Sequence, residues 1–385
     1  MRVALILPGF SATTADWAIP ALQNLVQQLG QQVDLHIFSQ RYPTPGAYNF
    51  EGIPHHALGG GQNFGIQSLR IWLRSSQAII AQHQQTPFDL LHAFWADEAG
   101  FSAAIAAQKI KRPLVVSLGG GELTHLPDIA YGAQRFLVRR LTTRFALRQA
   151  TRVTAGSNYQ LDLCRQHRVP LAKLRLVPLG VDTHRFQPPS AKPDLHQHPA
   201  LIQVASLLPV KNQALLLQTL HHLKQKLPHI TLHLVGSGPL EKGLVALSHE
   251  LKVHENIRWY SQVGYPELPA LFQQAHLYVQ TSRHESQGMA VLEGLACGVP
   301  MIGTPVGVGP EVAGWPPQTG AEALAQQAAQ ILQDEAGYLA QAQAAREVAE
   351  SQYTLAKTTA NFINIYQEIV DPHPQPLYSV ESLSR

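Results

Sequence analysis

At 385 residues, the chain is too long for one ordinary hydrophobic core, so we expect two domains. Hydrophobic residues make up 45% and charged residues 14%, as is typical of globular proteins, and a net charge of +3 does not indicate a nucleic-acid-binding protein. The chain has no run of eighteen apolar residues, so no membrane-spanning helix is expected. Met1–Leu7 is too short for a secretory signal, and Cys164 and Cys297 suit free buried thiols, so a cytoplasmic location is expected.

The first half of the chain alternates between strand-like and helix-like patterns. In chain order we expect a strand at 1–9, a helix at 21–29, a strand at 32–38, a helix at 69–85, a strand at 88–95, a helix at 100–108 and a strand at 112–122. This alternation predicts a parallel sheet with helices on both faces. Ligands bind beyond the carboxyl ends of such strands, where the glycine turns at Gly9 and Gly119–Gly121 fall.

A second alternating series follows a stretch rich in proline and polar residues. Its strands are expected at 200–206, 230–236, 256–260, 277–281 and 299–304. We therefore predict an α/β protein with two Rossmann-like αβα domains, and the family resemblance described below implies that they face each other across a cleft. The predicted divisions are an N-terminal domain at 1–186, a linker at 187–199, a C-terminal domain at 200–350, a helix at 351–370 and a disordered tail at 371–385.

The most informative segment is TSRHESQGMAVLE, residues 281–293. It places Glu285 and Glu293 eight positions apart with Gly288 between them, and predicts a strand ending near Gln280, a loop with Glu285, and a helix starting near Gly288. Amide groups at a helix start are unpaired and suit phosphate, while the carboxylates can accept sugar and ribose hydroxyls. The spacing alone is equally consistent with a capping Glu285 and a solvated Glu293.

In its wider context this segment resembles the signature of retaining glycosyltransferases of family 4, which have the GT-B fold. The family's usual form is P-S-x-x-E-G-F-G-x-x-x-x-E-A-x-A-x-G-x-P. The chain keeps seven of its positions: Ser282, Glu285, Gly288, Glu293, Ala296, Gly298 and Pro300. It departs from the family at Thr281, Ser286, Gln287 and Gly294, where proline, glycine, phenylalanine and alanine are usual.

Further segments extend the resemblance over most of the chain, and it is strongest from Ala200 to Ala313. Residues 177–188 are similar to the family hinge, with Leu179 in place of asparagine, and residues 353–369 are similar to a helix that crosses back to the first domain. The resemblance implies a GT-B glycosyltransferase that moves a sugar from a nucleotide sugar to an acceptor with retention of configuration.

The resemblance also implies roles for individual residues. Glu285 would bind the transferred sugar, Glu293 the ribose, and Lys211 the diphosphate, so Glu285 and Lys211 are the predicted catalytic residues. Lys211 in SLLPVKNQAL matches the family's phosphate-binding lysine; the alternative is a solvated lysine at a helix start, where a cation opposes the helix dipole. The predicted donor-binding residues are Glu293, Ser286, Gln287, Gly288, Met289, Val263, Gly236, Ser206 and Gly9.

Several of these positions carry less information or depart from the family. Val263 would meet the nucleobase through its backbone, which leaves the base open, and Gly236 lies in a G-x-G-P turn near the diphosphate. Ser206 stands where the family has a second phosphate-binding arginine, so part of the leaving-group stabilisation is in doubt. Glu311 matches a glutamate late in the signature, although an acidic residue at a helix start explains it as well.

The first domain offers candidate contacts to the acceptor or the transferred sugar. Gly119 stands where many relatives have a histidine, and Glu122 and Gly120 follow closely. Glu122 is equally explained as a helix cap or a surface carboxylate. His92 matches a family histidine, with packing or strand-end hydrogen bonding as the alternative, and Asp16 could face the acceptor or cap a helix.

No aspartate pair has the Asp-x-Asp spacing of metal-dependent transferases, so neither a metal nor a cofactor besides the nucleotide sugar is expected. No residue is placed as a covalent nucleophile, so front-face transfer is the implied mechanism. Because Ser206 and Gly119 remove two family contacts, the alternative is a catalytically silent GT-B protein that binds a nucleotide sugar or assembles with an active transferase.

The expected acceptor is a sugar, a polysaccharide or a lipid-linked sugar, and no nucleic-acid partner is expected. The segment Arg135–Arg152 places arginines at roughly helical spacing, with Phe136, Leu137, Leu141 and Phe145 as an apolar face. A basic amphipathic helix can lie on an anionic membrane, which would make the protein peripheral on the inner face of the membrane. The alternative is a helix that packs on the core and exposes a solvated arginine face.

Overall fold

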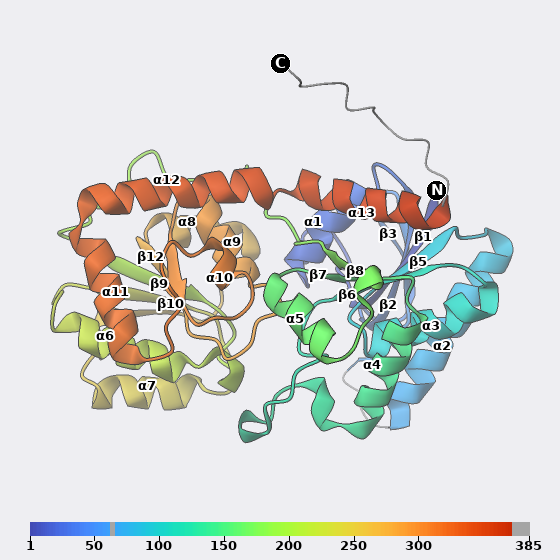
Figure 1. The fold of residues 1–385 in the computed structure, drawn as a ribbon, viewed down its shortest axis with the longest axis horizontal. Coiled ribbons are helices and arrows are strands. Elements are labelled where there is room, and N and C mark those ends of the chain that lie inside the picture. Colours follow the sequence, from blue (N-terminus) through green and yellow to red (C-terminus); the bar gives the residue numbers. More distant parts are fainter. Residues whose placement is uncertain (62–65, 372–385) are drawn as a thin grey trace, which may run out of the picture.

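The computed structural model describes residues 1–61 and 66–371, and it shows two α/β units side by side (Figure 1). The first unit is built on a sheet with the strand order β3-β4-β2-β1-β5-β6-β7-β8. All neighbouring strands in this order pair in parallel except β3, which joins the edge antiparallel to β4. The strands are β1 (Arg2–Gly9), β2 (Asp34–Tyr42), β3 (Gly46–Phe50), β4 (Ile53–Ala57), β5 (Leu90–Phe94), β6 (Leu114–Leu118), β7 (Arg152–Ala155) and β8 (Leu174–Leu176).

Helices cover both faces of this sheet, and apolar residues of its strands pack against them in two buried clusters. The helices are α1 (Pro20–Leu29), α2 (Ile66–Gln85), α3 (Glu98–Ile110), α4 (Leu137–Gln149) and α5 (Asn158–Gln166). Short 3-10 turns lie at η1 (Pro127–Ile129), η2 (Ala133–Arg135) and η3 (Leu171–Lys173). The central strands β1, β5 and β6 are nearly continuous apolar runs, as expected of the part of a sheet that is buried on both faces.

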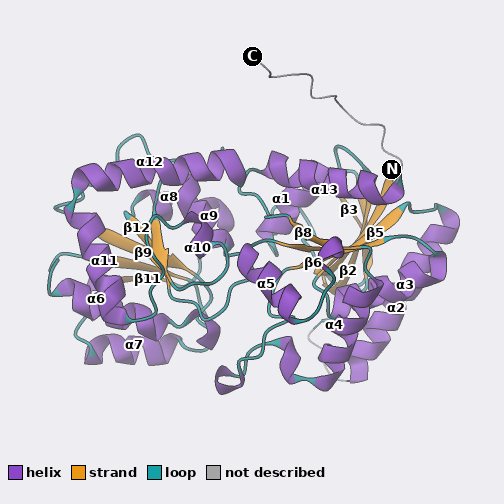
Figure 2. Cartoon of the chain, viewed as in Figure 1, coloured by secondary structure: helices purple, strands orange, loops and turns teal. Residues whose placement is uncertain are grey.

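The second unit contains a parallel sheet with the order β11-β10-β9-β12-β13, and Figure 2 shows its strands enclosed between helices. Its strands are β9 (Ala200–Val204), β10 (Thr231–Val235), β11 (Ile257–Tyr260), β12 (Leu277–Gln280) and β13 (Met301–Gly303). The helices are α6 (Gln213–Lys224), α7 (Glu241–Glu250), α8 (Leu268–Gln273), α9 (Met289–Ala296), α10 (Gly309–Val312) and α11 (Ala321–Gln333). The 3-10 turns are η4 (Pro209–Lys211), η5 (His254–Asn256) and η6 (Tyr265–Glu267).

Two long helices join the units along one side of the molecule (Figure 1). Helix α12 (Glu335–Gln352) packs against α9, and α13 (Leu355–Val370) packs against α1 of the first unit. Phe362, Ile365 and Tyr366 of α13 belong to the same buried cluster as apolar residues of β1 and β5. The prediction of two Rossmann-like layered units is confirmed, and the last helix lies on the first unit, as the resemblance implied.

Two local features differ from the sequence-based expectation. The hairpin β3–β4 and the short strands β7 and β8 were not predicted, because runs of three to five residues are too short to show a reliable period. Arg152 lies in β7, where it pairs with Glu368, and so does not continue the basic helix. The predicted disorder of the tail falls, from residue 372 onward, outside the described residues.

Candidate functional site

The order of the strands fixes where a ligand site can form. In the second sheet β9 is flanked by β10 and β12, and in the first sheet β1 is flanked by β2 and β5, so each sheet reverses its winding at these central strands. Chain segments leave the carboxyl ends of neighbouring strands in opposite directions at such a point, and this opens a crevice. The segments after β9 and β12 carry Lys211 and Glu285, Gly9 is the last residue of β1, and Trp95 directly follows β5.

Lys211 and Glu285 meet at this crevice although 74 positions separate them. The Lys211 Nζ atom lies 2.7 Å from the Glu285 Oε1 atom, and the Ser282 hydroxyl donates to the same oxygen at 2.6 Å. The two loops are joined by the Thr281 hydroxyl, which donates to the Lys211 carbonyl at 3.0 Å, and by the Arg283 amide, which donates to Val210. The side chains of Lys211 and Glu285 keep 23% and 15% of their surface exposed, so a ligand can reach both.

Helix α9 begins directly after this loop, as predicted. Gly288 precedes its first residue with φ +96°, a backbone conformation that favours glycine, and no side chain caps the first turn. The amides at this end of the helix are therefore free of side-chain caps beside the Lys211–Glu285 pair. A cation, a carboxylate and a helix start lie together, which is the arrangement needed to hold an anionic group next to a polyol.

Glu293 lies on α9 and is buried, with 6% of its surface exposed. Burial raises the pKa of its carboxyl to about 7, while a hydrogen bond with the Tyr265 side chain acts in the opposite direction. The alternative of a solvated Glu293 is therefore wrong, because the residue faces the core of the second unit. Its contact with a ribose stays a prediction.

A cavity of about 210 Å³ lies between the two units at this point. Trp95 and Gly119 line it from the first unit, and Glu285, Gln287 and Met289 line it from the second. The predicted donor-side loop therefore contributes both a carboxylate and apolar surface to a partly open space between the domains.

Ser286 and Gln287, which replace the usual glycine and phenylalanine, connect the two units. The Ser286 hydroxyl donates to the Gly119 carbonyl at 2.9 Å. The Gln287 amide accepts from the Leu179 N–H at 2.9 Å and donates to the Leu179 carbonyl at 2.7 Å. The sequence predicted these residues only as donor contacts; it gave no signal for a side-chain contact across the interface.

His284 is a further residue that the sequence analysis did not identify. Its ring is buried and lies within hydrogen-bonding distance of the Thr124 hydroxyl, the Tyr159 hydroxyl and the Gly120 carbonyl, all from the first unit. Burial lowers the pKa of this imidazole, which favours its neutral form. His284 therefore positions the loop that carries Glu285, and its only signal in the sequence was its place beside that glutamate.

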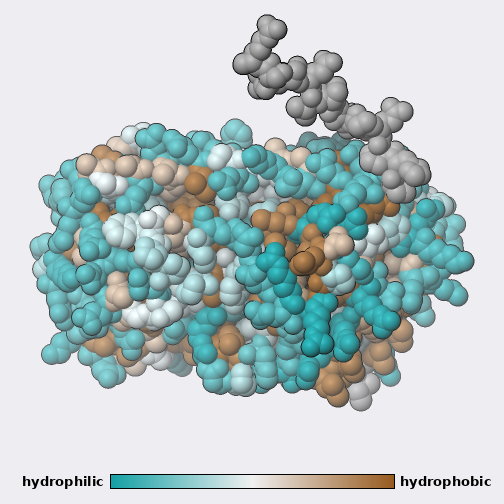
Figure 3. Space-filling model, in the orientation of Figure 1, coloured by the Kyte–Doolittle hydropathy of each residue, from teal (hydrophilic) through white to brown (hydrophobic). Residues whose placement is uncertain are grey.

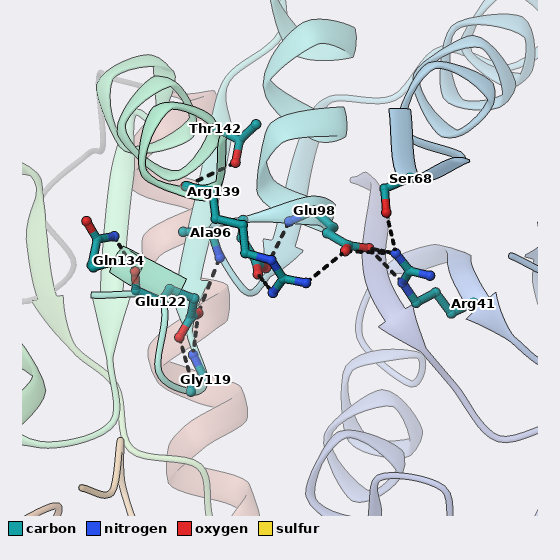
Figure 4. A network of polar contacts seen from close by, with 11 residues as sticks. Arg41, Ser68, Ala96, Glu98, Gly119, Glu122, Gln134, Arg139 and Thr142 are labelled. Carbon is teal, nitrogen blue, oxygen red and sulfur yellow. Dashed lines mark hydrogen bonds and ion pairs between the residues drawn. The ribbon is translucent and has the colours of Figure 1, made fainter. Parts of the chain in front are cut away.

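The glycine-rich loop after β6 is held by Glu122. Its carboxylate accepts hydrogen bonds from Gly119 at 3.1 Å, Gly120 at 2.7 Å and Ala96 at 3.3 Å, and Figure 4 shows it turned toward this loop. Burial, with a smaller effect of Asp97, raises its pKa to about 7. Glu122 is thus engaged by its own loop, and the predicted contacts of Glu122 and Gly120 with a sugar stay predictions that would require this loop to rearrange.

The other candidates of the first unit have structural partners. His92 is fully buried between the Tyr366 hydroxyl at 2.6 Å and the Ser117 hydroxyl at 2.7 Å, and burial lowers its pKa to about 3. This matches the packing interpretation. Asp16 accepts from the Ala12 amide and the Tyr42 hydroxyl, and Ile19 holds the N-cap position of α1, so Asp16 does not cap that helix.

The remaining donor-side candidates lie on several loops, and the Gly236–Gly238 turn is the one shown to approach the segment after β9. Gly236 and Gly238 have φ values of +137° and +159°, and a side chain on Gly236 would meet the Ala205 carbonyl at 2.0 Å, so this turn approaches the β9 loop closely. Ser206 is exposed, and Val263 is partly buried. Glu311 accepts from the Asn158 amide at the start of α5, which adds a contact between the units. Gly9 lies at the end of β1 against Tyr42.

The described residues contain neither a cluster suited to a metal ion nor a helix suited to a bilayer. No group of three or more histidine, cysteine, aspartate or glutamate side chains is close enough to hold a metal ion in this part of the chain. Among the same residues, no helix combines the length and the apolarity needed to cross a bilayer.

Comparison with known families agrees with this geometry. Residues 21–185 match the family model described as Glycosyltransferase Family 4, and residues 190–348 match the model described as Glycosyl transferases group 1. The chain belongs to the group 1 glycosyltransferases of family 4. The two matches divide the chain between its two α/β units, as expected of a GT-B protein.

This chain has curated relatives whose names refer to different acceptors. It is 30% identical over 188 residues to a GDP-mannose-dependent alpha-(1-6)-phosphatidylinositol monomannoside mannosyltransferase of Mycolicibacterium smegmatis, covering 45% of this chain and 49% of the relative. It is 27% identical over 317 residues to the N-acetyl-alpha-D-glucosaminyl L-malate synthase of Bacillus anthracis, covering 77% and 79%. The chain spans about half the length of the first of these relatives.

Solved structures share the fold over nearly the whole chain. Sucrose-phosphate synthase from Thermosynechococcus elongatus superposes with a TM-score of 0.77 at 18% identity, covering 97% of this chain and all of that chain. Anabaena HepE in complex with UDP-glucose superposes with a TM-score of 0.73 at 17% identity, covering 96% and 100%. At these identities the similarity establishes the GT-B fold alone.

Proposed function

We propose that this protein transfers a sugar from a nucleotide sugar to an acceptor with retention of anomeric configuration and without a metal ion. The observation that carries the proposal is the Lys211–Glu285 pair at the crevice, beside the start of α9 and the cavity between the units. An ammonium group and free helix-start amides can stabilise a departing diphosphate, which is the main electrostatic requirement of this reaction. The matching family models support the same reaction class.

In the proposed reaction the bond between the anomeric carbon and the diphosphate oxygen breaks, and the acceptor oxygen forms a bond to that carbon on the same face. The acceptor proton passes to the departing phosphate oxygen, so no protein nucleophile is needed. Lys211 and the amides of residues 287–289 stabilise the diphosphate. Glu285 accepts hydrogen bonds from the sugar hydroxyls, and Glu293 accepts one from the ribose.

A second candidate is a protein that binds a nucleotide sugar without transferring it. Ser206 and Gly119 favour this candidate, because neither supplies the cation or the imidazole usual at its position. A donor-hydrolysis assay separates the two candidates: release of the sugar from a bound donor supports the transferase, and binding without hydrolysis or transfer supports the silent protein.

The acceptor class is part of the proposal. The curated relatives include an enzyme named for a phosphatidylinositol monomannoside and one named for L-malate, so both lipid-linked and small acceptors fit. We favour a lipid-linked acceptor, with peripheral membrane contact through Arg135–Arg152, since this segment is strongly basic.

The test begins with thermal-shift measurements against UDP-, GDP- and ADP-sugars, since a ligand that binds only the folded state raises its melting temperature. With the donor identified, the anomeric configuration of the product is determined by NMR, and the rate is measured with and without a chelator. Retention and full activity with chelator support the proposal, whereas inversion or loss of activity refutes the corresponding part. Glu285→Ala should reduce turnover strongly with an unchanged circular dichroism spectrum; unchanged turnover would refute its role.

A further inference from the structure

The surface of α4 combines exposed apolar residues with unpaired positive charge. Phe136, Leu137, Val138 and Leu141 expose between 53% and 67% of their surface. The alternative, a helix that packs on the core and exposes an arginine face, describes the second half of α4, where Ala146 and Leu147 are buried and Phe145 packs against Phe101, but not the apolar residues of the first half. Figure 3 shows hydrophobic side chains gathered at the lower right of the molecule, where Figure 1 places the ends of α2 and α4.

A basic groove of about 660 Å³ runs beside these apolar residues, between α4 and the segment after α5. Its lining includes Arg140, Arg144, Arg148, Arg168 and Lys173, and it contains no aspartate or glutamate. Within residues 1–61 and 66–371, the guanidinium groups of these four arginines have no ion pair or side-chain hydrogen bond. Five cations without a counter-ion repel one another, so this groove is built to accept anions.

The opposite side of α4 explains why the groove arginines face outward. Arg139 pairs with Asp97 at 3.1 Å and with Glu98 at 3.6 Å, and Figure 4 shows it reaching toward Glu98 on α3. Arg140, Arg144 and Arg148 recur every four residues and so share one face of the helix. The side of α4 that carries Arg139 and the buried Ala146 and Leu147 therefore packs on the first unit, and the other three arginines are presented to solvent.

A second groove connects this surface with the crevice. A hollow of about 340 Å³ is lined by Arg135 and Phe136 and also by Trp95 and Tyr131. Trp95 also lines the cavity between the two units, which contains Glu285. An acceptor anchored in a bilayer under α4 would thus have a path toward the proposed site of transfer.

We propose that α4 and its basic groove form a docking surface for an anionic phospholipid bilayer. Arg140, Arg144, Arg148, Arg168 and Lys173 bind the phosphate headgroups, and Phe136, Leu137, Val138 and Leu141 enter the interfacial region. In a bilayer the charged headgroups lie next to the acyl chains, so one surface can offer partners to both the basic and the apolar residues. A soluble polyanion would leave the apolar residues uncovered. This inference rests on the membrane contact that is part of the proposed function. It does not depend on the other part, sugar transfer.

The test measures co-sedimentation without any donor. Vesicles of phosphatidylcholine are compared with vesicles in which part of this lipid is replaced by phosphatidylglycerol. The wild-type protein should bind the anionic vesicles and release them as salt is raised. Arg140→Gln/Arg144→Gln/Arg148→Gln should weaken this binding on the order of 100-fold, or about fivefold for each charge removed. Leu137→Ser/Leu141→Ser should weaken binding and leave its salt dependence in place.

The control is Lys242→Gln/Arg258→Gln, which removes exposed positive charge from the second unit and should bind as the wild type does. Circular dichroism melts confirm that each variant is folded, which is expected because the substituted residues are exposed. Equal binding to both kinds of vesicle, an unaffected arginine variant, or tighter binding to an RNA oligonucleotide would overturn the proposal. A protein that binds anionic vesicles but shows no transferase activity would support this docking surface and refute the proposed function.

Discussion

Replacing Lys211 with methionine tests the central ion pair, because methionine keeps much of the side-chain stem and removes the charge. At 2.7 Å and an effective dielectric constant of about 20, the attraction between Lys211 and Glu285 is about 6 kcal/mol before desolvation is counted. Exposed pairs contribute about 0.2–1 kcal/mol, and breaking a buried pair costs about 3–5 kcal/mol. These side chains are 23% and 15% exposed, so we expect Lys211→Met to lower the free energy of unfolding by about 1–3 kcal/mol.

The same substitution should reduce kcat by about 10²- to 10³-fold, since it removes a preorganised cation from the leaving diphosphate. The double variant Lys211→Met/Glu285→Gln separates the two effects. With no buried carboxylate left unpaired, it should recover about 1–2 kcal/mol of stability relative to Lys211→Met, but none of the lost activity. Stability is measured by urea denaturation and activity with the donor found by thermal shift.

Two results would refute this reasoning. If the double variant is no more stable than Lys211→Met, the two side chains do not interact in solution as they do in the structure. If Lys211→Met keeps the wild-type kcat with a verified donor, its charge does not act on the diphosphate, and another group must stabilise the departing phosphate.

The remaining predictions concern the interface and a buried carboxyl group. Gln287→Ala should lower the free energy of unfolding by about 2–4 kcal/mol in urea titrations, since both backbone groups of Leu179 lose a buried partner; an unchanged midpoint would show that the contact is absent in solution. Gly156→Ala should lower the free energy of unfolding by about 1–3 kcal/mol, because the new methyl group would lie 2.2 Å from the Gln287 Oε1 atom. In the Gln287→Ala background the same substitution should lower it much less, and equal effects in both backgrounds would contradict this contact. The pKa of the Glu293 carboxyl is raised from its ordinary 4.5 to about 7, so between these values the native state holds a proton that the unfolded state releases. The stabilisation from this proton is complete below pH 4.5, and the free energy of unfolding should fall by about 3 kcal/mol as the pH rises to 7. Glu293→Gln should flatten this dependence in urea titrations from pH 4.5 to 8, and a parallel pH profile in both proteins would contradict it.

The order of strands and helices follows from the sequence because it depends on local periodicity. The strand ending at Gln280, the glycine at position 288 and the helix that follows were all predicted within one or two residues. Apolar runs bounded by glycine and proline identify buried strands, and the signature from Ser282 to Pro300 identifies the family. The fold class and the membership of family 4 could therefore be predicted from the chain alone.

The sequence by itself thus determined the alternating elements, the two-domain division and the loop that carries Glu285. Only the tertiary structure brought Lys211 within 2.7 Å of that carboxylate, buried Glu293, and placed His284 and Gln287 at the contact between the units. It also decided that Leu137 and Leu141 face solvent while Phe145 packs inward. The physical reason is that period and propensity act over a few neighbouring residues, whereas burial and pairing depend on segments that meet only when the sheets, and then the two units, assemble.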